Sequence, residues 1–459
     1  MTHGPSIAEL RDRFTGRVIG PEDPVYDETR TVFAGDVDRR PAVIVRVADA
    51  VDVAGAIAVA RETGLELAVR SGGHSGAGHG TTEGGIVLDL RDMKGLEIDA
   101  DARTAWAETG LTAAEYTTAA GAHGLATGFG DTGSVGLGGI TLSGGIGYLV
   151  RKHGLTIDSL LAAEVVAADG ELLRVDAEEH PDLFWAIRGG GGNRGVATRF
   201  RVRLHPVDTV VGGMLILPAT PEVVAGFMAE AEDASEELST IANVMPAPPM
   251  PFVPEDRHGE LVVMALMAFA GDVEAGERAV APFRSLAEPI VDMLKPMPYP
   301  EMFPPDEEDY RPTAVGRTMF VDRIDGGTVE TIVDRLAASD ASMRVAQLRV
   351  LGGAMARVPA DATAFAHRRS RIMANVAAFY EGPEDKARRR AWVDDLADAL
   401  GGEGAYVGFL TDEGQAGVRD AYPDETRARL AAIKARYDPT NLFRLNQNVP
   451  PDPGEVTRP

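Results

Sequence analysis

The chain has 459 residues, no cysteine and a formal net charge of −25, and 44% of its residues are hydrophobic. This length predicts two or three domains, and the absence of cysteine excludes disulfides, thiolate metal ligands and cysteine nucleophiles. The acidic charge disfavours nucleic acid and membrane surfaces as partners. Since no apolar run reaches the ~18–20 residues that span a bilayer and no signal-peptide pattern opens the chain, we expect a cytoplasmic enzyme.

The first 125 residues predict alternating short helices and strands. Ser6 and Glu9 form a capping box at the start of a helix, and Thr112 and Glu115 repeat that pattern. Apolar periodicity predicts strands at 42–47, 67–70, 85–89 and 104–108 and a helix at 49–63. The strand at 67–70 runs directly into the glycine-rich loop SGGHSGAGHG. This arrangement is a β-α-β unit that ends in a loop suited to ligand contact.

Two more glycine-rich stretches follow, at 126–147 and 189–195. Between them, Asp169-Gly170 predicts the turn of a β-hairpin. Glycine lets backbone approach a ligand, and successive N–H groups bind anions such as pyrophosphate, although tight turns explain glycine equally well. The letters GFGDTG at 128–133 fit the dinucleotide-binding pattern, but more glycine follows in place of an amphipathic helix. We therefore reject a nicotinamide site.

The character of the sequence changes near Pro206. Strands are predicted at 213–217, 260–269 and 345–351, and helices at 221–234, 272–287, 328–338 and 384–400. This alternation predicts a separate α+β domain with an antiparallel sheet. The tail is a predicted helix from Thr426, followed by YDPTNLFRLNQNVPP.

Four segments, taken in order, resemble the berberine-bridge-enzyme-like oxidases of the vanillyl-alcohol-oxidase superfamily. They are RSGGHS (70–75), VGLGGITLSGGIGYLVRKHGL (135–155), DLFWAIRGGGGNRGVATRFRVRLHP (182–206) and YDPTNLFRLNQNVPP (437–451). The resemblance implies an α+β fold with a two-lobed PCMH-type FAD-binding domain in residues 1–206, its core at about 38–206. An α+β substrate domain with an antiparallel sheet is expected at 207–419. Residues 420–459 are expected to return to the FAD domain.

The same resemblance implies FAD bonded covalently to His74. The alternative for His74 is a turn histidine that contacts FAD without a bond. Many family members attach FAD a second time through a cysteine, and Thr132 stands at that place here, so a single bond is expected. The cofactor-binding residues implied by the matching segments are His74, Arg70, Ser71, Gly72, Gly73, Ser75, His79, Thr132, Gly133, Gly136, Gly138, Gly139, Thr141, Gly144, Gly145, Gly147, Val196, Asn446 and Asn448.

Three residues of the substrate domain are the catalytic candidates. Tyr406 is the leading candidate for the base that deprotonates the substrate, because it precedes a strand-like GFL and matches a tyrosine that the family places beside the flavin. Packing or hydrogen bonding to FAD is an equal alternative for Tyr406. Gln347 and Arg349 alternate on a strand, so both should point to one face. A solvent-exposed face is their alternative, and a structural role is favoured for His367.

Two positions depart from the family pattern, and two carboxylates follow the strand-like GFL. Arg194 stands where an aromatic residue is usual, and Gly408 replaces a common asparagine. Asp412 and Glu413 are read as loop carboxylates, and no pattern indicates a metal site.

The expected activity is FAD-dependent oxidation of a C–OH or C–N bond in a small organic substrate, such as a sugar, an alcohol or a cyclic amine. O2 is the expected acceptor, with Val135 or Leu137 as candidate gates to the flavin. The alternatives are a dehydrogenase with another acceptor and a redox-neutral flavin-binding enzyme. A monomer or a homodimer is expected. The sequence does not choose among the substrates.

Overall fold

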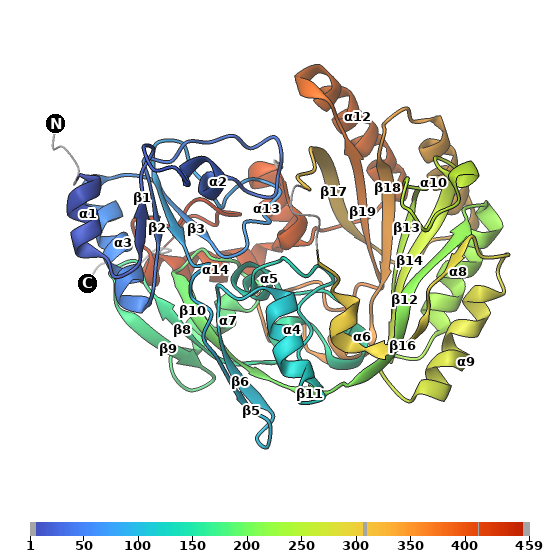
Figure 1. The fold of residues 1–459 in the computed structure, drawn as a ribbon, viewed down its shortest axis with the longest axis horizontal. Helices are drawn as coiled ribbons and strands as arrows, with labels where there is room; N and C mark the ends of the chain where they lie inside the picture. The colour runs from blue at the N-terminus through green and yellow to red at the C-terminus, as the bar shows by residue number, and fades with distance from the viewer. Residues whose placement is uncertain (1–5, 306–309, 412, 453–459) are drawn as a thin grey trace.

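The structure is a computed structural model that describes residues 6–305, 310–411 and 413–452 (Figure 1). Among these residues, none of the helices combines the length and the apolar character that a membrane crossing needs. Three larger sheets organise the fold, two before Pro206 and one after it, and a two-stranded ribbon joins β7 (Leu125–Ala126) to β11 (His205–Pro206).

The first lobe is a four-stranded sheet in the order β1-β2-β4-β3. Its elements are α1 (Ile7–Arg13), β1 (Arg17–Ile19), α2 (Tyr26–Arg30), β2 (Val43–Arg46), α3 (Ala50–Thr63), β3 (Leu67–Arg70) and β4 (Ile86–Asp89). Helix α3 begins where the Asp49 carboxylate accepts hydrogen bonds from two backbone N–H groups, and it ends at Gly64 in the left-handed conformation. Both β2 and β3 pair with β4 in parallel, so their carboxyl ends, including the start of the loop after Arg70, share one edge.

The second lobe is an antiparallel five-stranded sheet in the order β5-β6-β10-β8-β9. It contains β5 (Leu96–Asp99), β6 (Thr104–Glu108), α4 (Ala113–Gly121), α5 (Leu137–Ser143), α6 (Val150–His153), η1 (Thr156–Asp158), β8 (Leu160–Val166), β9 (Leu172–Asp176), α7 (Pro181–Ile187) and β10 (Val196–Arg203). Both predicted capping boxes are present, at Ser6 and Thr112. The predicted hairpin is also confirmed as β8 and β9.

After Pro206 the chain builds an eight-stranded antiparallel sheet. Its strands are β12 (Thr209–Pro218), β13 (Leu238–Pro246), β14 (Leu261–Phe269), β15 (Val291–Asp292), β16 (Lys295–Pro298), β17 (Ala314–Val321), β18 (Arg344–Val350) and β19 (Ile372–Phe379). Helices α8 (Pro221–Asp233), α9 (Val273–Arg284) and α10 (Gly326–Ala338) lie on the side away from the first two lobes (Figure 1). Helix α12 (Gly382–Leu400) joins them in one apolar cluster with the sheet, so the other face of the sheet is left to meet the first two lobes.

The C-terminal segment lies against the first two lobes. Helices α13 (Gly414–Ala421) and α14 (Asp424–Tyr437) contribute Tyr422 and Leu430 to the core of the second lobe. Beyond α14, Leu442 and Phe443 enter the core of the first lobe. A buried hub fixes this turn, because Asp438 accepts hydrogen bonds from the N–H groups of both residues (2.7 and 2.9 Å) and pairs with Lys434 at 3.2 Å.

Two differences from the sequence-based expectations concern the later half. The expected strand after Tyr406 is wrong, because residues Val407–Phe409 form a 3-10 turn, η4, in which the Phe409 N–H binds the Tyr406 carbonyl. Strands β13, β15, β16, β17 and β19 were not predicted. Short helices η2 (Glu255–Arg257), η3 (Tyr299–Met302) and α11 (Gly353–Arg357) complete the described part of the chain. Asp412 lies outside the described residues.

Candidate flavin and substrate site

The glycine-rich loop after β3 carries His74 and places it against the second glycine segment. A hydrogen bond of 2.9 Å joins His74 Nε2 to Ser134 Oγ. The Phe33 ring stacks on the imidazole, with centroids 4.4 Å apart, and the Phe33 N–H donates to the Gly73 carbonyl at 3.1 Å. The ring is therefore oriented by one polar and one aromatic contact before any cofactor is considered.

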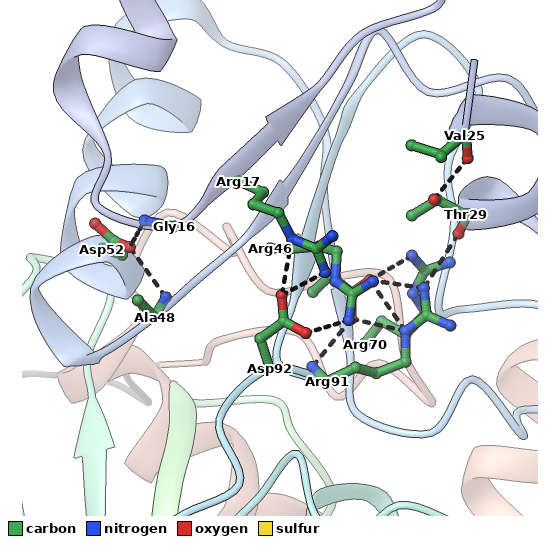
Figure 2. A network of polar contacts seen from close by, with 11 residues as sticks. Gly16, Arg17, Val25, Thr29, Arg46, Ala48, Asp52, Arg70, Arg91 and Asp92 are labelled. Atoms are coloured by element: carbon green, nitrogen blue, oxygen red, sulfur yellow. Dashed lines mark hydrogen bonds and ion pairs between the residues drawn. The ribbon is translucent and has the colours of Figure 1, made fainter. Parts of the chain in front are cut away.

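The base of this loop is anchored by a buried ion pair. Arg70 and Asp89 are 1% and 0% exposed, and their charged groups lie 2.7 Å apart. Burial raises the pKa of Asp89, but Arg70 and Arg91 outweigh it, so the pKa is lowered overall and the carboxylate stays charged. Figure 2 shows Arg70 and Arg91 within a wider network that also includes Asp92. The Arg70 side chain thus positions the loop from beneath and already has a partner.

The second glycine segment approaches the first so closely that side chains could not fit between them. A Cβ atom added to Gly136 would lie 2.1 Å from Ser71 Oγ and 2.2 Å from the backbone nitrogen of Gly72. Ser71 Oγ donates to the Thr109 carbonyl at 2.5 Å and accepts from the Gly138 N–H at 3.2 Å. Glycine at 72 and 136 is therefore required by contact, and α5 begins directly after this crossing.

Several predicted cofactor residues fit a polar, flat guest. The Cβ position of Gly139 faces open space within 4 Å. Thr141 Oγ1 and Asn446 Oδ1 are buried, and neither has a hydrogen-bond partner among the described residues. Buried polar atoms of this kind are normally satisfied. The glycine cradle and these two atoms suit the carbonyl, N–H and phosphate groups of FAD.

The other predicted cofactor residues take varied positions. Burial lowers the pKa of His79 to about 4, so its half-buried ring is neutral. Asn448 Oδ1 accepts from Lys434 at 3.2 Å and belongs to the C-terminal hub. Neighbouring side chains crowd Gly133, Gly144 and Gly145, where an added Cβ would lie 3.1, 3.0 and 1.9 Å from the nearest atom, and the Gly130 backbone crowds Gly147 at 2.2 Å. Gly73 takes a positive φ, and Ser75 Oγ accepts a hydrogen bond from the His79 N–H. Thr132 Oγ1 donates to Asp131, and Val196 is buried in β10.

The eight-stranded sheet contributes a chain of side-chain hydrogen bonds on one face. Arg349 Nε donates to Gln347 Oε1, and Gln347 Nε2 donates to Asn243 Oδ1, each at 2.9 Å. Asn243 Nδ2 then donates to the Met264 carbonyl at 3.0 Å. The register pairs Asn243 of β13 with Gln347 of β18, so these side chains share one face, as the strand alternation at 347 and 349 predicts.

Arg349 also reaches the second glycine segment. Its Nη2 lies 2.6 Å from Asp131 Oδ2, and the two side chains are 6% and 18% exposed. Asp131 belongs to the second glycine segment, three residues before Ser134. Arg349 thus contacts Asp131, to which Thr132 also donates, and His74 contacts Ser134. Asp131 and Ser134 lie in the same glycine segment, and sequence reasoning did not select either of them.

Tyr406 lies against the second glycine segment as well. Its hydroxyl oxygen accepts a hydrogen bond from the Gly145 N–H at 3.1 Å, and the ring is buried. Burial is the main cause that raises the pKa of Tyr406 to about 12. The phenol is therefore neutral at physiological pH, so it can donate a hydrogen bond but holds its proton firmly.

The two departures from the family pattern have local explanations. Arg194 is fully buried, and its guanidinium donates to the carbonyls of Gly190 and Leu430 at 3.0 and 3.1 Å. It thereby joins the third glycine run to α14. Gly408 sits against the Tyr406 ring, where an added Cβ would lie 3.0 Å from it.

His367 occupies a packed site between elements. Its ring stacks on Phe320 at 4.5 Å, and its Nε2 lies 3.1 Å from the Ala421 carbonyl. Burial lowers its pKa. No group of three or more His, Cys, Asp or Glu side chains with metal-binding geometry occurs among residues 6–305, 310–411 and 413–452.

Three half-buried histidines predict sensitivity to mild acid. Burial lowers the pKa of His79 and His205 to about 4 and that of His153 to about 3, and the last two rings stack at 4.1 Å. The unfolded chain binds more protons than the folded one between pH about 6.5 and 4, so stability falls as the pH falls through that window. We expect a loss of a few kcal/mol in total, since partial exposure reduces the ~1.4 kcal/mol per pKa unit.

Thermal unfolding between pH 7.5 and 5 measures this loss. The double variant His153→Gln, His205→Gln should show a shallower decline of Tm than the unmodified protein. An equal decline in both would assign the acid sensitivity to other groups.

Comparisons with known proteins identify the family and the fold. A family model described as an FAD binding domain matches residues 41–176, and one described as berberine and berberine-like matches residues 405–450. The (R)-6-hydroxynicotine oxidase of Paenarthrobacter nicotinovorans is 31% identical over 95% of this chain and 97% of its own length. The crystal structure of 6-hydroxy-D-nicotine oxidase from Arthrobacter nicotinovorans has a TM-score of 0.84 at 28% identity and covers 96% of this chain and 98% of that one. The xylooligosaccharide oxidase of Myceliophthora thermophila has the same fold, with a TM-score of 0.84 at 23% identity over 98% of this chain and all of its own.

Proposed function

Because the chain belongs to the berberine-bridge-enzyme-like family of FAD-linked oxidoreductases, we propose that it holds FAD covalently through His74 and oxidises a small organic substrate with O2 as acceptor. The observation that carries the proposal is the placement of His74. Its ring is fixed by Ser134 and Phe33 at the crossing of two glycine segments that no side chain separates.

FAD supplies the two-electron acceptor in this reaction, and the chain supplies the geometry. The substrate loses two electrons and two protons from a C–OH or C–N bond, and O2 carries both away as hydrogen peroxide. Arg349 and Gln347 present polar groups on the sheet face that meets the FAD lobes. Neutral Tyr406 donates a hydrogen bond toward substrate or cofactor while the Gly145 N–H holds its oxygen in place.

The range of relatives supports a small polar substrate without selecting one. Names among them include a hydroxynicotine oxidase and a xylooligosaccharide oxidase. The side-chain amides of Asn243 and Gln347 and the Arg349 guanidinium, whose charge Asp131 balances, suit a neutral substrate with several hydroxyl or amine groups.

An anaerobic screen tests the proposed reaction. Purified protein is mixed with sugars, alcohols and cyclic amines without O2, and loss of the yellow flavin absorbance marks a substrate. Readmitting air should restore the colour and release hydrogen peroxide. Bleaching that air does not reverse would assign a different acceptor, and no bleaching by any of the three classes would contradict the proposed reaction.

The Tyr406→Phe variant tests the role of the phenol. We expect kcat to fall about tenfold, because the variant removes one hydrogen-bond donor worth about 1.4 kcal/mol at the reacting centre, and KM to change little. The Gly145 N–H loses its acceptor, so stability should fall by about 1–3 kcal/mol. Steady-state kinetics and thermal unfolding separate the two effects. A lower Tm with unchanged kcat would leave Tyr406 a packing role only.

A further inference from the structure

The ion pair between Asp131 and Arg349 joins the second glycine segment to the substrate sheet. The contact is 2.6 Å, and both side chains are largely removed from solvent. The Phe409 ring lies 5.3 Å from the guanidinium carbon. A pair with so little water around it keeps more of its electrostatic influence than a surface pair does.

The guanidinium is held in one orientation from behind. Its Nε donates to Gln347, which donates to Asn243, and the chain ends on the backbone carbonyl of Met264. Because the last acceptor is a strand backbone group, the whole series is fixed to the sheet. Arg349 is thus presented to Asp131 with little freedom.

The pair lies within electrostatic reach of the flavin attachment loop. Asp131 is three residues before Ser134, whose hydroxyl contacts His74 at 2.9 Å. Three residues span at most about 11 Å. Buried tyrosines surround the carboxylate, and its charge adds to the effect of burial in raising the pKa of both Tyr148 and Tyr299.

We propose that Arg349, held by Gln347 and Asn243, neutralises Asp131 beside the flavin and so sets how readily the flavin accepts electrons. Two-electron reduction adds negative charge to the flavin. An unpaired carboxylate nearby opposes that gain, an unpaired guanidinium favours it, and the intact pair does neither. Arg349 and Asp131 are in this respect positioning residues, and the inference rests on the proposed placement of FAD at the His74 loop.

Two single variants of the holoenzyme should shift the flavin in opposite directions. In Arg349→Met the equilibrium constant for flavin reduction, measured anaerobically against a reference dye, should fall about tenfold. In Asp131→Asn it should rise by a similar factor. The double variant should return close to the unmodified value, and Arg349→Lys, which keeps the charge, should remain near it. Arg357→Met, which removes the pairing with Glu236, is the matched control and should leave the constant unchanged.

Each other outcome has a separate meaning. Shifts of both single variants in the same direction, or a Lys variant that behaves like Met, would overturn the electrostatic role. If both single variants keep the unmodified equilibrium constant and also keep their flavin in the pellet after acid precipitation, this inference alone is overturned. Flavin released from the unmodified protein by acid would instead overturn the proposed bond to His74.

Discussion

The His74→Ala variant is expected to release its FAD when the protein is precipitated with acid, leaving a white pellet and a yellow supernatant. The unmodified protein should leave a yellow pellet. Without the bond the flavin is less firmly oriented and less oxidising, so kcat should fall at least about tenfold, which corresponds to ~1.4 kcal/mol of barrier. Pellet colour and steady-state kinetics measure the two effects.

His79 provides the matched control for this variant. It lies five residues further along the same loop, and the proposed bond is made by His74 alone. His79→Ala should therefore keep the flavin in the pellet. A yellow pellet from His74→Ala would place the attachment on another residue.

The Gly136→Ala variant is expected to lose FAD together with stability. The added methyl group would lie 2.1 Å from Ser71 Oγ and 2.2 Å from the Gly72 nitrogen, so the two loops must separate. Overpacking of this kind costs about 1–3 kcal/mol, and the separation also moves Ser134 away from His74. Flavin absorbance per protein and Tm should both fall.

Gly326→Ala is the control for adding a methyl group elsewhere. Nothing lies within 4 Å of its Cβ position at the start of α10, so Tm and flavin content should be unchanged. If Gly136→Ala kept normal flavin content, the close crossing of the two loops would not be needed for cofactor binding.

Local signals in the sequence predicted the elements that depend on neighbouring residues. The capping boxes at Ser6 and Thr112 each require only two side chains three residues apart, and both are present. The Asp169-Gly170 turn likewise defines its own hairpin. The order of four motifs predicted the family, because it samples both ends of the chain.

Elements that depend on distant partners were missed or misassigned. Strand β13 contains Ser239, Thr240 and Asn243, which weaken its apolar pattern, yet every residue in it is buried between β14 and β18. The apolar letters after Tyr406 suggested a strand, but Val407–Phe409 closes into a 3-10 turn, and the nearby β-bridge to Phe320 is made by Glu403, before Tyr406.

The candidate site was predictable in its loops and not in its cross-domain contacts. Asp131 lies in the GFGDTG pattern, which suggested only dinucleotide binding. Its partner Arg349 is far away in the sequence, so their contact could not be predicted. A lone carboxylate within an otherwise uncharged glycine stretch was the one available signal. Phe33 gave no signal, because its contact with His74 depends on how the loop after β3 folds back.

The most direct measurement of the central claim is the mass of one tryptic fragment. Trypsin cuts after Arg70 and Arg91, and the fragment 71–91 contains both His74 and His79. The fragment should carry the added mass of FAD, and fragmentation should place that mass on His74. An unmodified fragment, or FAD on any other residue, would contradict the account.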